Sequence, residues 1–301
     1  MTAIAEPYQP GWISWAEIAA LGVIWGASFL SVAIALEGIS PLWVVSGRLL
    51  IAALTLGVLC AVMGLRMPPW GERRLWAHII GFAIFSNAVP LALTAWAQQE
   101  VPSSFVGVTM ALVPLFTLGL AHFLLPGERL TLPRVAGFAL GLVGVVVLIG
   151  PAALSAGGGS LLARLTCVLV TLSYATGSII TRRSPPVDPI VYATAALILA
   201  TLVVLPVTLI AEGLPPVPPL RPLLALLYSG FLPTALASLL MVHVIRTAGP
   251  AFLIQTNYQV PIWSVLLGTL ILSEPLPPAF LIALVLILSG LAVSRLRLSW
   301  R

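Results

Sequence analysis

Charge and cysteine are what this sequence has least of. Only 8% of its 301 residues are charged, lysine is absent, and Cys60 and Cys167 are its two cysteines. A soluble domain carries about 25% charged residues, so this chain lacks the polar surface that would coat a soluble globule. Both cysteines fall within apolar runs, which disfavours a disulfide framework and indicates small buried side chains. The sequence is therefore one that lipid must solvate.

Catalytic and metal-binding signatures are missing as well. The sequence has no His-Glu-x-x-His motif, no Walker loop, no glycine fingerprint after a strand and no acidic pair at membrane depth. With 9 acidic residues and 3 histidines, an intramembrane enzyme has little to work with. We expect no enzyme activity, no metal and no cofactor. The net charge of +5 could indicate nucleic acid, but arginine placement explains it better, so no nucleic-acid partner is expected.

Long apolar runs are what the sequence does have. Hydrophobic residues make up 60% of the chain and the mean hydropathy is +1.11. Runs of about 20 residues without strict alternation indicate membrane helices rather than a barrel. The sequence predicts an all-α integral membrane protein with ten spans. They are 14–36, 40–64, 75–97, 102–125, 131–150, 160–181, 189–211, 220–246, 250–272 and 276–296.

The chain also repeats itself. Val101-Pro102, Val113-Pro114 and Gly127-Glu128-Arg129-Leu130 return as Gly249-Pro250, Val260-Pro261 and Ser273-Glu274-Pro275-Leu276, at an offset that drifts from 148 to 146 residues. An internal repeat of half the chain is typical of transporters built from two related halves, with the solute site where the halves meet. We expect repeats over 1–156 and 157–301, with helices 1–5 and 6–10 and a boundary near Gly157–Gly159.

Arginine placement predicts the topology. With ten spans, eleven arginines fall on one side and two, Arg164 and Arg221, on the other, while Arg48 lies within the second span. The positive-inside rule makes the eleven-arginine side cytoplasmic and puts both termini there. Five spans per half is an odd number, so the repeats have inverted topology and the loops bearing Glu128 and Glu274 lie on opposite sides.

Proline marks the interior of four spans. Pro90 is matched with Pro233, and Pro114 with Pro261; each frees the carbonyl four residues earlier, namely that of Ser86, Ser229, Met110 or Asn257. Polar side chains gather at the same levels. Freed backbone polarity is tolerated in a membrane only inside protein or beside a water-filled cavity. The sequence favours a central polar cavity with these four prolines as hinges, and the alternative is static packing kinks.

Two further groups of residues are candidates for the cavity wall. Gln255-Thr256-Asn257-Tyr258-Gln259 is the densest polar run in any span, read either as substrate contacts or as hydrogen-bonding glue between helices. Trp25 and Tyr174 lie at mid-depth at equivalent repeat positions, read either as an aromatic wall or as helix packing. The candidate cavity-lining residues are Trp25, Ser86, Asn87, Thr109, Tyr174, Tyr228, Gln255, Asn257 and Tyr258.

Ionisable groups at mid-depth are scarce. His78, His122 and His243 fall toward cytoplasmic helix ends, where a lone histidine is more often structural than a proton relay. Arg48 could snorkel, pair with a carbonyl or meet a substrate carboxylate, and a structural role is favoured. The fifth span carries a ridge of Gly137, Gly141 and Gly144 for helix packing. Both it and the nearly uniform tenth span are expected outside the cavity.

These motifs resemble a known family. Ile24-Trp25-Gly26-Ala27-Ser28-Phe29 and Ser46-Gly47-Arg48-Leu49-Leu50 resemble the first and second helices of the EamA family in the drug/metabolite transporter superfamily. Val101-Pro102-Ser103-Ser104, Pro114, Gly127-Glu128-Arg129-Leu130, Gly137 and Gly144 resemble its helix 4–5 signature. The resemblance covers nearly the whole chain, with a degenerate second half. It implies a ten-helix inverted repeat that exports small metabolites, and it is nearest to exporters of aromatic amino acids of the YddG type.

Three functions remain in competition. The first is a carrier of amino acids and similar amphipathic metabolites in a bacterial inner membrane, working by alternating access and facilitated diffusion. The second is a nucleotide-sugar or sugar-phosphate carrier, ranked lower because a phosphate would want several cations and only Arg48 is available. The third is an intramembrane enzyme. The expected partners are a small-molecule solute and the lipid bilayer, while the oligomeric state is left open.

Overall fold

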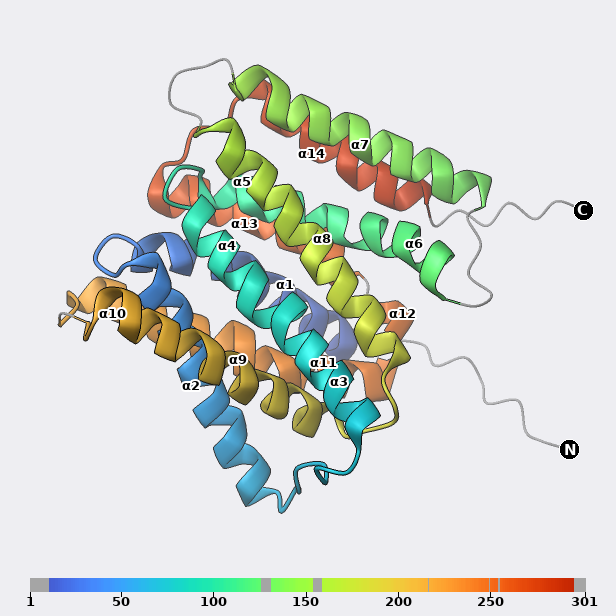
Figure 1. Cartoon of the computed structure of the whole chain (residues 1–301). Coiled ribbons are helices and arrows are strands. Elements are labelled where there is room, and N and C mark those ends of the chain that lie inside the picture. The colour runs from blue at the N-terminus through green and yellow to red at the C-terminus, as the bar shows by residue number, and fades with distance from the viewer. Residues whose placement is uncertain are drawn as a thin grey trace, which may run out of the picture.

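The structure is a bundle of helices (Figure 1). It is a computed structural model that describes residues 11–125, 131–153, 159–215, 217–248, 250–253 and 255–294. No strand occurs among these residues. The first half contains α1 (Trp12–Ala35), α2 (Pro41–Val62), α3 (Arg73–Phe82), η1 (Ala83–Ala88), α4 (Val89–Ala97), α5 (Ser103–Thr109), η2 (Met110–Leu112), α6 (Val113–Leu124) and α7 (Leu132–Ala153). The second contains α8 (Leu161–Arg183), α9 (Pro189–Glu212), α10 (Leu220–Gly230), η3 (Phe231–Leu236), α11 (Ala237–Ala248), α12 (Pro250–Leu253), α13 (Thr256–Leu272) and α14 (Pro278–Val293).

Eight of the helical stretches are long and apolar enough to cross a membrane. They are Trp12–Ala35, Pro41–Val62, Arg73–Ala97, Ser103–Leu124, Leu132–Ile149, Leu161–Arg183, Pro189–Glu212 and Leu220–Met241. Their ends lie close to the predicted ones, because prolines, glycines and polar residues end these helices locally. Of the last two predicted spans, one is described as α12 and α13 with a break between them, and the other is the 16-residue α14. Ten spans therefore stay a prediction.

The two halves share their irregularities as well as their helices. The third helix of each half is interrupted by a π-helical segment, η1 at Ala83–Ala88 and η3 at Phe231–Leu236. These segments stand 148 residues apart, which is the offset of the sequence repeat. Pro233 lies inside η3, whereas Pro90 follows η1, so these prolines occupy corresponding helices but different positions. Matching Pro90 with Pro233 by symmetry was wrong, because the wider π turns mark the equivalent sites.

Polar contacts sort the helix ends into two sets. On one side, the structure joins Arg221 to Glu37 (3.2 Å), Ser40 to Glu212, the Ser103 N–H to Glu274 (2.7 Å) and the Ser160 N–H to Glu100 (2.9 Å). On the other, the Tyr192 hydroxyl donates to the His78 carbonyl (3.1 Å) and His243 meets Glu17 (3.1 Å). This alternation of ends is what successive crossings of a membrane produce. The loop bearing Glu128 and the linker glycines Gly157 and Gly158 lie outside the described residues.

Arg164 lies inside the bundle at the start of the sixth predicted span. It lies in the first turn of α8 with 1% of its surface exposed, donates to the Ile149 carbonyl at 3.2 Å and stands 5.8 Å from the centre of the Phe105 ring. A carbonyl near the end of α7 and an aromatic face stabilise this buried cation. Arg164 thus holds helices together on the side opposite most of the arginines.

α7 and α14 form a pair along one edge of the bundle (Figure 1). A Cβ atom built on Gly137 would stand 2.3 Å from the Gly290 carbonyl oxygen, and one on Gly144 would stand 2.6 Å from Ile287. Backbones approach this closely only where side chains are missing. The predicted glycine ridge is therefore the packing face of α7. The cavity described below is lined by other helices.

Candidate solute-binding site

Two aromatic side chains join the first helix of one half to the third helix of the other. The Trp25 Nε1–H donates to the Pro233 carbonyl at 3.1 Å, and the Tyr228 hydroxyl donates to the Ile24 carbonyl at 3.3 Å. Both rings are partly buried. The polar group of each ring donates its hydrogen bond to a backbone carbonyl. The apolar face of the ring remains available to pack against other side chains or a solute.

Arg48 reaches the same level from α2. Its Nε–H donates to the Thr234 Oγ1 at 3.1 Å, and the Thr234 hydroxyl donates to the Ser229 carbonyl at 2.9 Å. Pro233 has no N–H, and this is why the Ser229 carbonyl is free to accept a side chain. In the π-helical segment η3, the carbonyl that lacks a backbone donor is therefore bound by a short chain of hydrogen bonds that begins at the Arg48 guanidinium.

Tyrosines from two helices lie near this guanidinium. They are Tyr174 of α8 and Tyr228 of α10. Arg48 itself is only partly buried. The interpretation of Arg48 as a structural residue left it out of the candidate site. The signal that could have included it was a lone charge within an apolar span, because intramembrane charges are costly and functional.

A cavity of about 510 Å³ lies between α1 and α10. Its lining consists of Ala27, Leu30, Ser31 and Ile34 from α1 and Leu220, Arg221, Leu224, Ala225 and Tyr228 from α10. Arg221 stands beside Glu37 at the helix ends, and Tyr228 lies about two turns farther into the bundle. Tyr228 is therefore the residue that links the cavity to Arg48. It is also the one predicted cavity residue that the lining contains.

Ser86 and Asn87 lie in η1, which packs against α8. Asn87 is buried and its Nδ2 donates to the Phe82 carbonyl at 3.3 Å, within the widened turn. A Cβ on Gly177 would stand 1.9 Å from the Ser86 Oγ, so these helices touch there. Ser86 therefore lies at a contact between helices, Asn87 bonds within its own helix, and neither residue is part of the cavity lining.

The remaining predicted residues lie on the fourth and ninth spans. Thr109 is fully buried and its hydroxyl donates to the Val106 carbonyl at 2.6 Å, one turn back in its own helix. Gln255 is exposed at the start of α13, while Asn257 and Tyr258 are partly buried. The polar run therefore stands at a helix start, and these four residues are separate from the cavity lining. Their role as substrate contacts stays a prediction.

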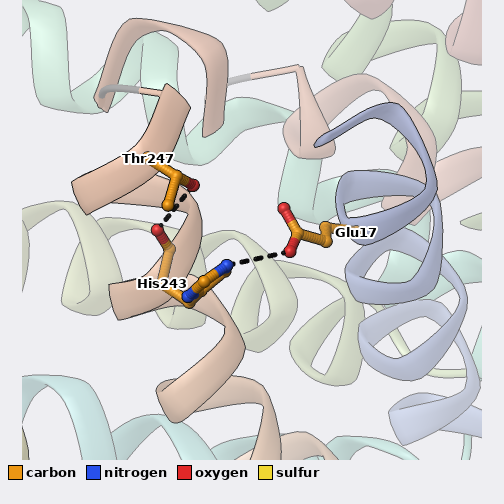
Figure 2. Close-up of polar contacts among 3 residues, drawn as sticks. All are labelled: Glu17, His243 and Thr247. Carbon is orange, nitrogen blue, oxygen red and sulfur yellow. Dashed lines mark hydrogen bonds and ion pairs between the residues drawn. The ribbon is translucent and has the colours of Figure 1, made fainter. Parts of the chain in front are cut away.

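A histidine–carboxylate contact joins the halves near the start of α1. The His243 Nε2 lies 3.1 Å from the Glu17 Oε1, and the Thr247 hydroxyl donates to the His243 carbonyl at 2.9 Å. Figure 2 shows the imidazole of α11 pointing at the Glu17 carboxylate of α1. Across the described ranges, no group of three or more His, Cys, Asp or Glu side chains is placed to hold a metal ion.

Comparison with known proteins matches both halves. The model of the EamA-like transporter family matches residues 11–150 and again residues 161–296. The uncharacterized inner membrane transporter YedA of Escherichia coli K12 is 28% identical over 83% of this chain and 80% of its own length. Protein PecM of Dickeya dadantii is 27% identical over 90% and 88%. A probable terminal-alkyne amino-acid exporter of Streptantibioticus cattleyicolor is 28% identical over 42% and 41%.

The fold has a solved counterpart. A crystal structure of a protein with 23% sequence identity superposes with a TM-score of 0.66, over 96% of this chain and 99% of that one. Two related helical halves with apolar spans and a cavity between their helices define a membrane transport protein. The chain belongs to the EamA-like transporter family, within the drug/metabolite transporter superfamily. With inner-membrane relatives and eight apolar helices, it is an integral inner-membrane protein.

Proposed function

We propose that this transporter exports small amphipathic metabolites, first among them amino acids with apolar or aromatic side chains. The observation that carries the proposal is Tyr228, which lines the cavity and, like Tyr174, lies near Arg48. An apolar wall with aromatic faces suits an apolar side chain, and the few polar groups suit a zwitterion. The relative named as an amino-acid exporter and the resemblance to exporters of the YddG type support the same class.

The proposed mechanism is alternating access by an inverted repeat of ten spans with both termini in the cytoplasm. The bundle would rock about Pro90, Pro114, Pro233 and Pro261, where the helices contain π-helical, 3₁₀ or proline-interrupted turns. The described acidic residues stand at helix ends or in loops, away from the level of Arg48. We therefore propose facilitated diffusion, in which a high cytoplasmic concentration drives export.

A purified-protein assay tests the proposal. The protein in liposomes should take up radiolabelled phenylalanine, leucine or tryptophan faster than protein-free liposomes, and should release each amino acid chemically unchanged. Tyr228→Ala should slow uptake by roughly 2- to 12-fold, because an aromatic contact contributes about 0.5–1.5 kcal/mol. Tyr228→Phe, which keeps the ring, should stay near the wild-type rate. A panel in which no amino acid moves would exclude this function.

Two other functions have less support. A nucleotide-sugar or sugar-phosphate carrier would place several cations around a phosphate, whereas Arg48 is the one cation found at this level of the described bundle. An intramembrane enzyme would change its solute, so chemical analysis of the solute recovered from the liposomes separates it from a transporter. Inhibition of amino-acid uptake by a nucleotide sugar at equal concentration would favour the phosphate-carrier alternative.

A further inference from the structure

Arg48 carries a charge that the described protein does not neutralise. A guanidinium has five N–H donors in a planar fork. The Nε–H is used by Thr234, a neutral hydroxyl whose own proton goes to the Ser229 carbonyl. The two terminal Nη groups make no hydrogen bond within the described chain. They are also absent from the set of fully buried polar atoms without a partner, so they are not fully buried. The outer edge of the fork therefore faces accessible space.

The described carboxylates have other partners or lie elsewhere. Glu17 meets His243, Glu37 meets Arg221, Glu100 accepts from Ser160, Asp188 accepts from the Ile190 N–H, Glu212 accepts from Ser40 and Glu274 accepts from Ser103 and Ser104. Glu72 is exposed before α3. A cation at membrane depth without a counter-ion is costly. An anionic ligand that arrives from the cavity would offset this cost.

The surroundings of Arg48 select the kind of anion. The repeat offset of 148 places Ala196 opposite Arg48 in the second half, so the symmetry supplies one cation and not two. One guanidinium whose Nη edge is free matches the two oxygens of a single carboxylate, end-on and bidentate. Tyr174 and Tyr228 stand on α8 and α10 within electrostatic reach, and Tyr228 also lines the cavity. A planar or apolar group attached to the carboxylate would meet these rings.

We propose that Arg48 is the carboxylate anchor of the solute site, and that Thr234 fixes its guanidinium so that the Nη edge faces the solute between Tyr174 and Tyr228. The solute class is then a carboxylate with an apolar or aromatic body. Its amino group contributes less to binding than its carboxylate does. This inference rests on the proposed transport function, whose solute it narrows.

Ligand-induced thermal stabilisation of the purified full-length protein in nanodiscs tests the anchor without any flux. The probes are phenylalanine, 3-phenylpropionate, which lacks the amino group, and phenethylamine, which lacks the carboxylate. A ligand that binds the folded state raises the unfolding midpoint according to its concentration relative to Kd. Phenylalanine and 3-phenylpropionate should stabilise the wild type. Phenethylamine should need at least about a tenfold higher concentration to produce the same shift in the unfolding midpoint.

Variants of Arg48 distinguish a residue that binds the solute carboxylate, an anchor, from one that only holds α2 and η3 together, a strut. Arg48→Met should raise the phenylalanine and 3-phenylpropionate concentrations for half the shift by about tenfold or more, and should leave phenethylamine unchanged. Arg48→Lys should recover part of the binding, because it keeps the charge and loses the fork. Arg73→Met, which removes an exposed arginine at the start of α3, is the matched control and should bind like wild type.

The outcomes are distinguishable. If Arg48→Met weakens all three probes equally, the residue is a strut and the proposal is overturned. If Arg48→Met does not fold, the wild-type comparison decides, since stabilisation by phenethylamine equal to that by 3-phenylpropionate overturns it as well. If carboxylate probes stabilise the protein only when Arg48 is present, but liposomes show no amino-acid uptake, Arg48 is a carboxylate anchor and amino-acid transport is rejected. If liposomes take up amino acids but stabilisation does not depend on Arg48, transport is supported and the anchor is rejected.

Discussion

At the scale of the residue, Glu274 shows how one carboxylate can join the two halves. Its oxygens accept from the backbone N–H groups of Ser103 (2.7 Å) and Ser104 (3.0 Å), the first residues of α5. Helix starts leave such N–H groups without partners, and an anion there also meets the positive end of the helix dipole. The helix 4–5 resemblance singled out Glu128 and its repeat copy Glu274. Its capping role was visible only once the helices were placed.

Removing this cap should destabilise the protein. Glu274→Ala leaves two backbone donors of α5 unsatisfied, and the loss of a capping side chain costs about 0.5–2 kcal/mol. Chemical or thermal unfolding in micelles should show a lower midpoint. Glu72→Ala is the matched control, because Glu72 precedes α3 and its side chain makes no capping bond there. Equal midpoints for the two variants would contradict the assignment of Glu274 as a cap.

Glu100 gives a prediction about pH. Hydrogen bonds from the Ser160 hydroxyl and backbone N–H lower the pKa of the Glu100 carboxyl below its usual 4.5. A lowered pKa contributes stability that is present above the unfolded value and is lost as pH falls through the folded value. Glu100→Gln should therefore unfold at a lower temperature than wild type at pH 7, and the difference should shrink below about pH 4.5. A difference that stays constant with pH would indicate a packing effect instead.

At the scale of the element, close packing of α1 on α13 depends on Gly26. A Cβ there would stand 2.6 Å from the Trp263 Cβ and 3.0 Å from the Ser264 backbone nitrogen. Backbone cannot swing away as a flexible side chain can, so the helices would have to separate. The sequence left open whether the segment around Trp25 forms an aromatic wall or packs against another helix. Its partner on α13 could not be predicted, because the rotation of each helix is decided by its neighbours.

Gly26→Ala should therefore cost about 1–3 kcal/mol through overpacking, in spite of the better helix propensity of alanine. Unfolding midpoints and transport rates should both fall. Gly57→Ala in α2 is the control, because a Cβ added to Gly57 would meet nothing within 4 Å and alanine favours the helix. It should be neutral or stabilising. If the two variants behave alike, α1 and α13 are not packed as described.

At the scale of the whole molecule, topology follows from the alternation of helix ends. Trp70 and Val217 are strongly exposed, with 81% and 95% of their surfaces open, and belong to ends on opposite sides. In a background without Cys60 and Cys167, an impermeant thiol reagent added to intact cells should label Val217→Cys and spare Trp70→Cys, because the positive-inside rule predicts that the arginine-rich side faces the cytoplasm. Cysteine at Glu128 should behave like Trp70→Cys. Labelling of Trp70→Cys and Val217→Cys from the same side would sink the inverted topology.

Energetics is a second property of the whole molecule. Coupling to protons needs a titrating group on or beside the solute path. Glu17 and His243 join α1 to α11 (Figure 2). Glu17 lies near the start of α1, whereas the cavity is lined by the later part of that helix. We expect amino-acid uptake into liposomes to equilibrate, and an imposed pH gradient should not concentrate the solute. Gradient-driven accumulation that a protonophore abolishes and His243→Gln removes would make this pair the coupling site and refute facilitated diffusion.

The helices and the repeat could be read from the sequence because their causes are local. A helix in lipid satisfies its own backbone, so a run of about 20 apolar residues becomes a helix whatever surrounds it. The spans ending near Ala97 and Leu124 were predicted within a residue or two for this reason. The break before Thr256 was missed, because the sequence showed polarity there without showing how the chain turns.

The site was decided by the tertiary structure. Arg48 and Thr234 are 186 residues apart in sequence, and Trp25 and Pro233 are 208 residues apart. Mid-depth polarity and aromatic residues predicted that Trp25, Tyr174 and Tyr228 would matter. Which of them meet Arg48 depends on helix rotation, and side-chain packing sets that rotation across the whole bundle. Composition and periodicity made this chain a two-part membrane bundle, and the packing of the two parts put the Arg48 guanidinium, held by Thr234, near a cavity that Tyr228 lines.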